Sequence, residues 1–205
     1  MVKLILVRHC QAQGNLERYF QGKIDSDITQ KGREQIGITA EVLSAEPIDV
    51  FYTSAKQRAR KSTDGINFYH DMPVVTDERL TEIDAGKWEG RYLTDIEKEF
   101  PKEYDDWKNN PAVFHAPGGE SMSQVYYRVS AALKDIIAAN QGKTVCIVSH
   151  GCAIKCMMCF LHGWPVDRIA EIALGSNMAI NVVKVHDNLT FEIVMENYTD
   201  HLSGR

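Results

Sequence analysis

The sequence predicts an α/β protein, a three-layer α/β/α sandwich with a mostly parallel central sheet. Two observations lead to this prediction. Apolar runs of strand length alternate along the chain with segments whose apolar residues recur at helical spacing, as in parallel strands joined by helices. The runs at 3–7 and 144–148 are also almost entirely apolar, which is typical of strands buried on both faces of a sheet.

The first half of the chain alternates strands with helices. Residues 3–7 form a strand that ends in a polar, glycine-containing loop. Thr29 is the expected N-cap of a helix that stops before Pro47, because apolar residues at helical spacing follow it. The further elements expected here are a strand at 48–52, a helix at 56–68 and a short strand at 74–75.

The second half begins with the longest expected helix. It starts at Glu120 or Ser121 and runs to residue 139, since apolar residues recur there every three or four positions. After it we expect a strand at 144–148, a helix at 152–162 and a hairpin of strands 181–186 and 191–196 around Asp187-Asn188, a strong turn pair.

The 205 residues suit one globular domain, so residues 1–205 are predicted to form a single domain. A chain of this size can bury about 70% of its unfolded surface without metals or disulfides. Residues 91–119 are rich in proline and glycine, and they fit a lid-like insertion with short helices. The aromatic residues expected in that lid are Tyr104, Trp107, Phe114 and His115, and the charged candidates near it are Arg18, Lys23 and Arg91.

Charge and hydropathy exclude several classes of partner. With 23 basic and 28 acidic residues, the net charge of -5 lacks the basic field that nucleic acid or anionic membranes attract. No apolar run approaches the roughly 18 residues of a membrane span. Arg8-His9 interrupts the first apolar run before a signal peptide could form, and five cysteines make an odd number. We therefore expect a cytoplasmic protein with reduced thiols.

Two histidines occupy positions where α/β sheets bind ligands. His9 and His150 each directly follow a predicted buried strand, and ligands gather at the carboxyl ends of such strands. Arg8 precedes His9, and Arg58 follows the strand at 48–52. Two arginines and two histidines in one place would suit a small dianion such as phosphate.

Five segments carry these residues and one further acid, in a characteristic order. They are Arg8-His9-Cys10 with Gln21-Gly22 and Ile28-Thr29-Gln30-Lys31-Gly32, then Ser54-Ala55-Lys56-Gln57-Arg58, Leu80-Thr81-Glu82-Ile83, Pro117-Gly118-Gly119-Glu120-Ser121 and Ser149-His150-Gly151. In these residues and their order the chain resembles the histidine phosphatase superfamily, also called the phosphoglycerate mutase-like family. The resemblance extends over residues 3–151 and implies that family's fold.

The resemblance implies that His9 is a nucleophile that becomes a phosphohistidine. Neutral imidazole offers the lone pair that phosphoryl transfer to a protein group requires. Arg8, Arg58 and a protonated His150 would neutralise the charge of the transferred group, so no metal ion and no cofactor is expected. Glu82 is placed as the acid that protonates the leaving group and later activates water. The residues expected to bind phosphate or substrate are Arg8, Asn15, Gln21, Gly22, Arg58, His150 and Gly151.

The expected function is metal-independent hydrolysis of small phosphomonoesters, with a small phosphorylated metabolite as the partner. A cofactor-dependent phosphoglycerate mutase is the alternative, although such mutases are usually longer and typically carry Thr-Gly where Gln21-Gly22 stands. A catalytically silent binding protein on the same fold is less favoured, because every catalytic position is filled. The sequence leaves open the identity of the substrate and whether the chain forms a homodimer.

The cysteines do not indicate a different chemistry. None is followed six residues later by arginine, which excludes the cysteine-based phosphatases. Cys152, Cys156 and Cys159 have the spacing of an iron-sulfur triad, but they share one face of an apolar helix and are expected to be buried structural thiols. Cys10 replaces the glycine of the family signature. Its thiol either packs in the core or faces the phosphate pocket as a reactive thiolate.

Overall fold

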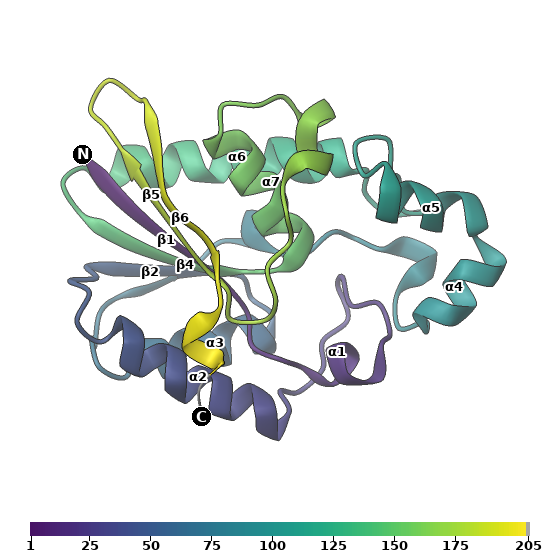
Figure 1. Ribbon diagram of the computed structural model, residues 1–205, viewed down its shortest axis with the longest axis horizontal. Coiled ribbons are helices and arrows are strands. Elements are labelled where there is room, and N and C mark those ends of the chain that lie inside the picture. The colour runs from purple at the N-terminus through teal and green to yellow at the C-terminus, as the bar shows by residue number, and fades with distance from the viewer. Residues whose placement is uncertain (204–205) are drawn as a thin grey trace.

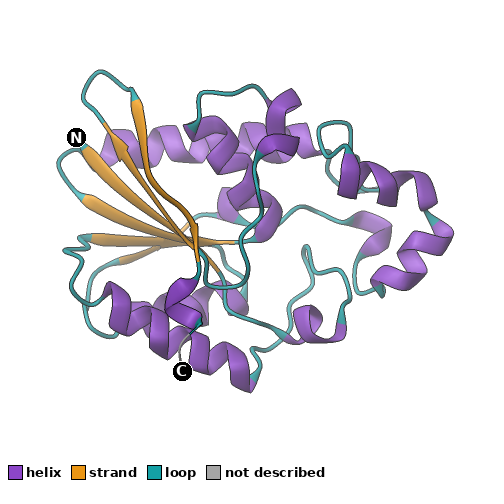
Figure 2. Cartoon of the chain, viewed as in Figure 1, coloured by secondary structure: helices purple, strands orange, loops and turns teal. Residues whose placement is uncertain are grey.

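The computed structural model of the protein describes residues 1–203 and contains a six-stranded central sheet (Figure 1, Figure 2). The strands are β1 (Val2–Arg8), β2 (Val50–Thr53), β3 (Val74–Thr76), β4 (Thr144–Ser149), β5 (Ile180–Val185) and β6 (Phe191–Tyr198). Their order across the sheet is β3-β2-β4-β1-β5-β6. The first four strands are parallel to one another, whereas β5 is antiparallel to both β1 and β6. The predicted α/β fold with a mostly parallel sheet is confirmed.

Helices cover both faces of this sheet (Figure 1). The pair on one face is α2 (Gln30–Leu43) and α3 (Gln57–Asn67), and the pair on the other is α6 (Met122–Ala139) and α7 (Gly151–Leu161). Side chains of a strand point alternately to opposite faces, so one strand can contribute to both layers. In β1, Leu4 and Leu6 pack in the core with α6 and α7, while Ile5 and Val7 pack in the core with α2 and α3. The sheet thus separates two apolar cores.

Capping residues set where two of the long helices begin. Thr29 precedes α2, and its hydroxyl accepts a hydrogen bond from the backbone N–H of Gly32 at 3.0 Å. Ser121 precedes α6, and its hydroxyl accepts from the backbone N–H of Gln124 at 3.2 Å. The Gln124 side chain accepts in return from the N–H of Ser121 at 2.8 Å. These bonds satisfy amides that a helix start leaves unpaired, and both starts agree with the sequence prediction.

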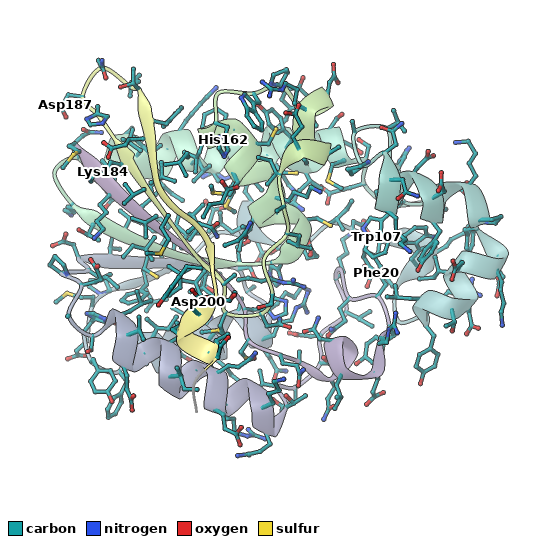
Figure 3. All side chains as sticks on the ribbon, viewed as in Figure 1. Phe20, Trp107, His162, Lys184, Asp187 and Asp200 are labelled. Atoms are coloured by element: carbon teal, nitrogen blue, oxygen red, sulfur yellow. The ribbon has the colours of Figure 1, made fainter. Side chains whose placement is uncertain are left out.

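Between β3 and α6 the chain leaves the sheet and forms short helices beyond its carboxyl edge, α4 (Leu93–Glu99) and α5 (Pro101–Asn109) (Figure 1). The fully buried Trp88 packs at the base of this insertion. The rings whose centroids lie 5.0–6.5 Å from that of Trp88 belong to Phe20, Phe100, Tyr104, Trp107 and Phe114. Phe20 and Trp107 lie close together, with ring centroids 5.5 Å apart (Figure 3). Because Phe20 follows β1, this packing joins the insertion to the loop after β1.

The differences from the predicted elements are small. β2 begins at Val50 rather than at residue 48, and β6 continues to Tyr198 through an irregular register with β5. The short helix α1 (Gln13–Glu17) lies in the loop after β1, and its sequence holds a single large apolar residue, too few to show helical periodicity. No helix within residues 1–203 is long and apolar enough to cross a membrane.

Candidate active site

Two histidines meet at the carboxyl edge of the sheet. β1 and β4 are adjacent and parallel, with Arg8 level with Ser149. His9 and His150 directly follow these strands and therefore emerge at the same edge. Their ring centroids lie 5.1 Å apart, with an interplanar angle of 56°.

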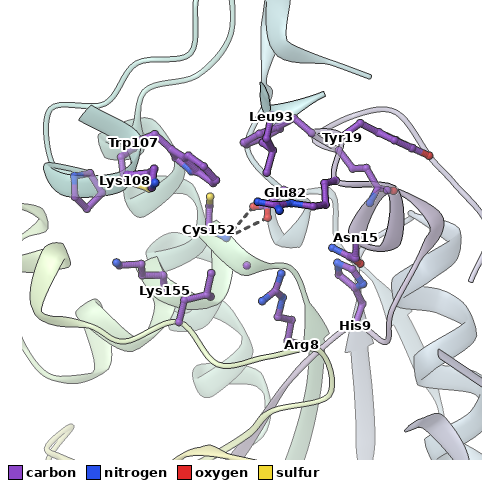
Figure 4. A pocket seen from close by; sticks show the side chains of 18 residues that line it. Arg8, His9, Asn15, Tyr19, Glu82, Leu93, Trp107, Lys108, Cys152 and Lys155 are labelled. Atoms are coloured by element: carbon purple, nitrogen blue, oxygen red, sulfur yellow. Dashed lines mark hydrogen bonds between the residues drawn. The ribbon is translucent and has the colours of Figure 1, made fainter. Parts of the chain in front are cut away.

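A cavity of about 460 Å³ opens beside His9 (Figure 4). It is bounded by the ends of β1 and α7, by α1 with the loop that follows, and by α5 of the insertion. The predicted site residues that line it are Arg8, His9, Asn15, Gln21, Glu82 and Gly151. Gly22, Arg58 and His150 are buried outside this lining.

His9 is held as a neutral imidazole. Its Nδ1 lies 2.7 Å from the carbonyl oxygen of Cys10, which assigns the proton to Nδ1 and leaves the lone pair on Nε2. Burial, together with the positive charges of Arg58 and Arg8, lowers the pKa of His9 well below its usual 6.5. An uncharged lone pair is therefore present at neutral pH in a side chain that lines the cavity.

Arg8 brings a buried donor without a partner to the cavity. Its Nη1 donates a hydrogen bond to the carbonyl oxygen of Gly175 at 2.7 Å, whereas its buried Nε has no hydrogen-bond partner. Burial lowers the pKa of Arg8, and the charge of Glu82 opposes that shift. Guanidinium groups keep their proton in proteins, so Arg8 supplies a fixed positive charge at the cavity wall.

Arg58 and His150 form a layer behind His9. The fully buried Arg58 donates from Nε to Nδ1 of His150 at 3.2 Å. Its other nitrogens donate to the carbonyl oxygens of Gln21, Gly22 and Ile24 at 3.0–3.2 Å and contact Asp25 at 3.4 Å. The guanidinium thus holds the loop at 21–25 against α3.

Two hydrogen-bond contacts fix the tautomer of His150. Because Nδ1 accepts from Arg58, the ring proton belongs on Nε2, which lies 2.6 Å from the hydroxyl oxygen of Ser54. Burial and the charge of Arg58 lower the pKa of His150 well below 6.5. His150 is therefore neutral in this structure, because a buried imidazole beside a guanidinium disfavours a second positive charge. A protonated His150 during phosphoryl transfer stays a prediction.

Glu82 sits at the N-terminal end of α7. Both carboxylate oxygens accept from the backbone N–H of Cys152 at 3.1 Å, and one also accepts from Ala153 at 3.3 Å (Figure 4). A Cβ on Gly151 would lie 3.4 Å from Glu82 Oε2 and 3.6 Å from Arg8 Cζ. The acid and the arginine therefore flank Gly151 at the start of α7.

The neutral residues of the expected binding set divide into two groups. Asn15 and Gln21 line the cavity; Asn15 Oδ1 accepts from the N–H of Ala12 at 3.0 Å, and Gln21 Oε1 accepts from the hydroxyl of Ser26. Gly22 does not line the cavity, because its N–H donates to Glu89 at 3.2 Å and a Cβ there would meet the carbonyl oxygen of Ile83 at 2.1 Å. Close packing, rather than contact with the cavity, accounts for that glycine.

The cysteines are buried. Cys10 is fully buried in the core with α2 and α3, and burial raises its pKa, so the hypothesis of a reactive thiol facing the pocket is wrong. Cys156 and Cys159 are buried thiols as predicted. Cys152 is also buried, and in addition it lines the cavity, because it lies in the first turn of α7.

The charged residues around the cavity differ from the expected set. Arg18 and Trp107 line it, but Lys23 pairs with Asp84 and Arg91 pairs with Glu99, both outside the lining. Lys108 and Lys155 also line the cavity, although neither was among the residues expected there. A signal for Lys155 exists in the sequence, since it is the single charged residue in the apolar segment 151–161.

Comparisons with known proteins agree on one family. The model of the histidine phosphatase superfamily (branch 1) matches residues 4–199. Phosphoserine phosphatase 1 of Hydrogenobacter thermophilus is 31% identical over 202 residues, covering 98% of this chain and 95% of its own. A probable phosphoglycerate mutase GpmB of Citrobacter koseri is 32% identical over 193 residues, covering 92% and 87%.

Among solved structures, Bacillus stearothermophilus YhfR superposes with a TM-score of 0.93 at 29% identity, covering 98% of this chain and 100% of its own. Family model, relatives and structure each cover nearly the whole length and include the segments that carry His9, Arg58, Glu82 and His150. The chain therefore belongs to the histidine phosphatase superfamily and is a phosphatase of that superfamily.

Proposed function

We propose that the protein hydrolyses small phosphomonoesters through a phosphohistidine on His9, without a metal ion. The observation that carries this proposal is the state of His9. It is neutral, it lines the cavity, and it lies next to Arg8, whose Nε has no partner. A neutral nucleophile beside a fixed positive charge suits attack on a phosphate ester.

The transfer step follows from these positions. A phosphate held by Arg8 accepts the lone pair of His9 Nε2, the bond from phosphorus to the ester oxygen breaks, and the leaving alkoxide takes a proton from Glu82. Glu82 enters this step as the protonated acid and leaves it as a carboxylate.

The second step returns the enzyme to its starting state. Glu82, now a carboxylate, takes a proton from water as the oxygen attacks phosphorus and the bond to His9 breaks. Inorganic phosphate leaves, His9 is neutral again, and Glu82 carries the proton needed for the next cycle. Arg58 lies behind His9 and adds positive charge without lining the cavity.

Trapping the intermediate tests the proposal. Wild type mixed with a phosphorus-labelled substrate and quenched in base is expected to carry label that acid removes, as a phosphohistidine does. His9→Ala is expected to lose this label and at least about a thousandfold in kcat/KM. His186→Ala is the control, because His186 lies outside the cavity and faces Glu192 at 3.1 Å. Turnover that vanishes with EDTA and returns with Mg²⁺ would refute the metal-independent mechanism.

A phosphoglycerate mutase is the second candidate, because relatives at 32% identity are named as probable mutases. Mass balance separates the two activities. A phosphatase releases one inorganic phosphate for each substrate consumed, whereas a mutase interconverts 2-phosphoglycerate and 3-phosphoglycerate faster than phosphate appears. We expect stoichiometric phosphate release.

A further inference from the structure

We propose that Lys155, assisted by Lys108 and Arg18, binds a carboxylate on the leaving group, so that the preferred substrates are phosphate esters of hydroxy acids without an ammonium group. The proposal rests on the proposed function, since Lys155 lines the same cavity as His9. It assigns to Lys155 the selection of substrate by charge.

Lys155 has no hydrogen-bond or ion-pair partner in the described part of the chain. It is half-buried on α7, the helix in which it is the single charged residue. Within residues 1–203 no hydrogen bond or ion pair engages its ammonium, and no carboxylate is among the groups that favour its charge. Burial consequently lowers the pKa of Lys155. A half-buried ammonium without an anion is costly, and a carboxylate in the cavity would relieve that cost.

Three cations besides Arg8 line the cavity. Lys108 lies on the α5 side and Lys155 on the α7 side (Figure 4), and Arg18 ends α1. Among the described ion pairs none involves these three residues, and Lys108 contacts the ring of Tyr104 at 5.2 Å. The described part of the cavity wall therefore presents three positive charges without an ion-pair partner, in addition to Arg8.

A partner for an ammonium group is missing from the described lining. Its single carboxylate is Glu82, and the backbone amides of α7 already engage it. A substrate with a phosphate at Arg8 and a carboxylate near Lys155 meets opposite charge at both ends. An added ammonium would face cations instead, which penalises amino-alcohol phosphates and, to a lesser degree, phosphoserine. The cavity volume suits a ligand of this size.

Three esters of equal chain length test the assignment: 3-phosphooxypropionate, propyl phosphate and 3-aminopropyl phosphate. We expect kcat/KM to fall in that order. The first ester should exceed the second by at least about tenfold, which corresponds to the weakest usual hydrogen bond to a charged group. Lys155→Met should reduce this ratio about tenfold, Lys155→Glu should favour the aminopropyl ester, and Lys155→Arg should keep the carboxylate preference.

A ratio of kcat/KM values between two esters, measured on one variant, does not depend on how much of that variant is active. Lys31→Met is the matched control, because Lys31 is exposed on α2 outside the cavity. Equal rates of wild type on the three esters, or an unchanged ratio in Lys155→Met, would overturn the assignment. Such outcomes would leave His9-dependent phosphate release intact. Failure of the proposed function would instead appear as no phosphate release from any of the three esters.

Discussion

At the scale of single residues, backbone groups hold the two side chains that would exchange phosphate and protons. The carbonyl oxygen of Cys10 sets the tautomer of His9, and the N–H of Cys152 holds the carboxylate of Glu82. The backbone fixes both groups in position before a ligand enters. Preorganised donors and acceptors of this kind are what electrostatic catalysis requires.

The protonation state of His9 predicts how stability depends on pH. His9 is neutral when folded because its pKa lies well below 6.5, but it takes up a proton near pH 6.5 when unfolded. The unfolded state then binds more protons below pH 6.5, so stability falls with decreasing pH, by up to about 1.4 kcal/mol per pH unit for one such histidine. In urea unfolding at pH 7.5, 6.5 and 5.5, the free energy of unfolding of His9→Asn should fall less steeply with decreasing pH than that of wild type. A slope equal to that of wild type, or a similar change in the control His186→Asn, would contradict the neutral state.

The position of Glu82 predicts a dependence on the leaving group. Glu82→Gln removes the proton donor, so alkyl phosphates should lose on the order of a hundredfold in kcat/KM. p-Nitrophenyl phosphate should lose less than about tenfold, since its leaving group hardly needs a proton. The exposed Glu78→Gln serves as control. Equal losses on both substrates would remove Glu82 from the acid role.

At the scale of elements, α6 positions the segment that carries Glu82. Arg128 on α6 donates to the carbonyl oxygens of Arg79, Thr81 and Glu82 at 2.8, 2.7 and 3.1 Å. Its guanidinium also binds the carboxylate of Glu120 at 2.8 and 2.9 Å. One arginine therefore ties three carbonyls to a helix, and it acts on the acid through the backbone.

Removal of Arg128 should reproduce part of the loss of activity on alkyl phosphates that we expect for Glu82→Gln. Arg128→Met leaves three carbonyls and the carboxylate of Glu120 without their donor, which should cost about 2 kcal/mol in unfolding free energy. Activity should fall more on alkyl phosphates than on p-nitrophenyl phosphate, because the acid loses its position. A uniform loss on both substrates would indicate a purely structural role. Arg60→Met, at an exposed site on α3, should change neither quantity.

At the scale of the whole molecule, the sheet keeps all five thiols away from solvent. Cys146 lies within β4, and burial raises its pKa above the ordinary range. Burial also raises the pKa of the other four thiols, which are Cys10, Cys152, Cys156 and Cys159. Thiolate formation in the native protein is therefore suppressed.

This burial predicts the pattern of alkylation. Native protein treated with iodoacetamide should be labelled slowly, with Cys152 first because it lines the cavity, and vanadate should slow that label. The remaining four cysteines should be labelled together, at the rate of global unfolding. Peptide mass spectrometry after timed quenches measures each site, and rapid labelling of Cys10 in the native protein would contradict the buried position described above.

Local pattern made most of the fold predictable. Strand and helix periods depend on neighbours in the sequence, so β1, β4, α2 and α6 appear within a few residues of their predicted bounds. The antiparallel hairpin β5-β6 was also predictable from the sequence, because its turn residues are adjacent in the chain. The five-residue helix α1 was not, since it is too short to show a period and depends on tertiary contacts.

The sequence by itself determined the family, the strand-to-helix order and the placement of His9 and His150 at one sheet edge, because each follows from residues close together in the chain. Only the tertiary structure decided that Cys10 turns into the core and that Arg58 and His150 lie behind His9. It also decided that Lys155 lines the cavity, whereas Lys23 pairs with Asp84. The physical reason is that burial, charge pairing and the walls of a cavity depend on segments that are distant in sequence. Their packing sets which side chain meets solvent, ligand or core.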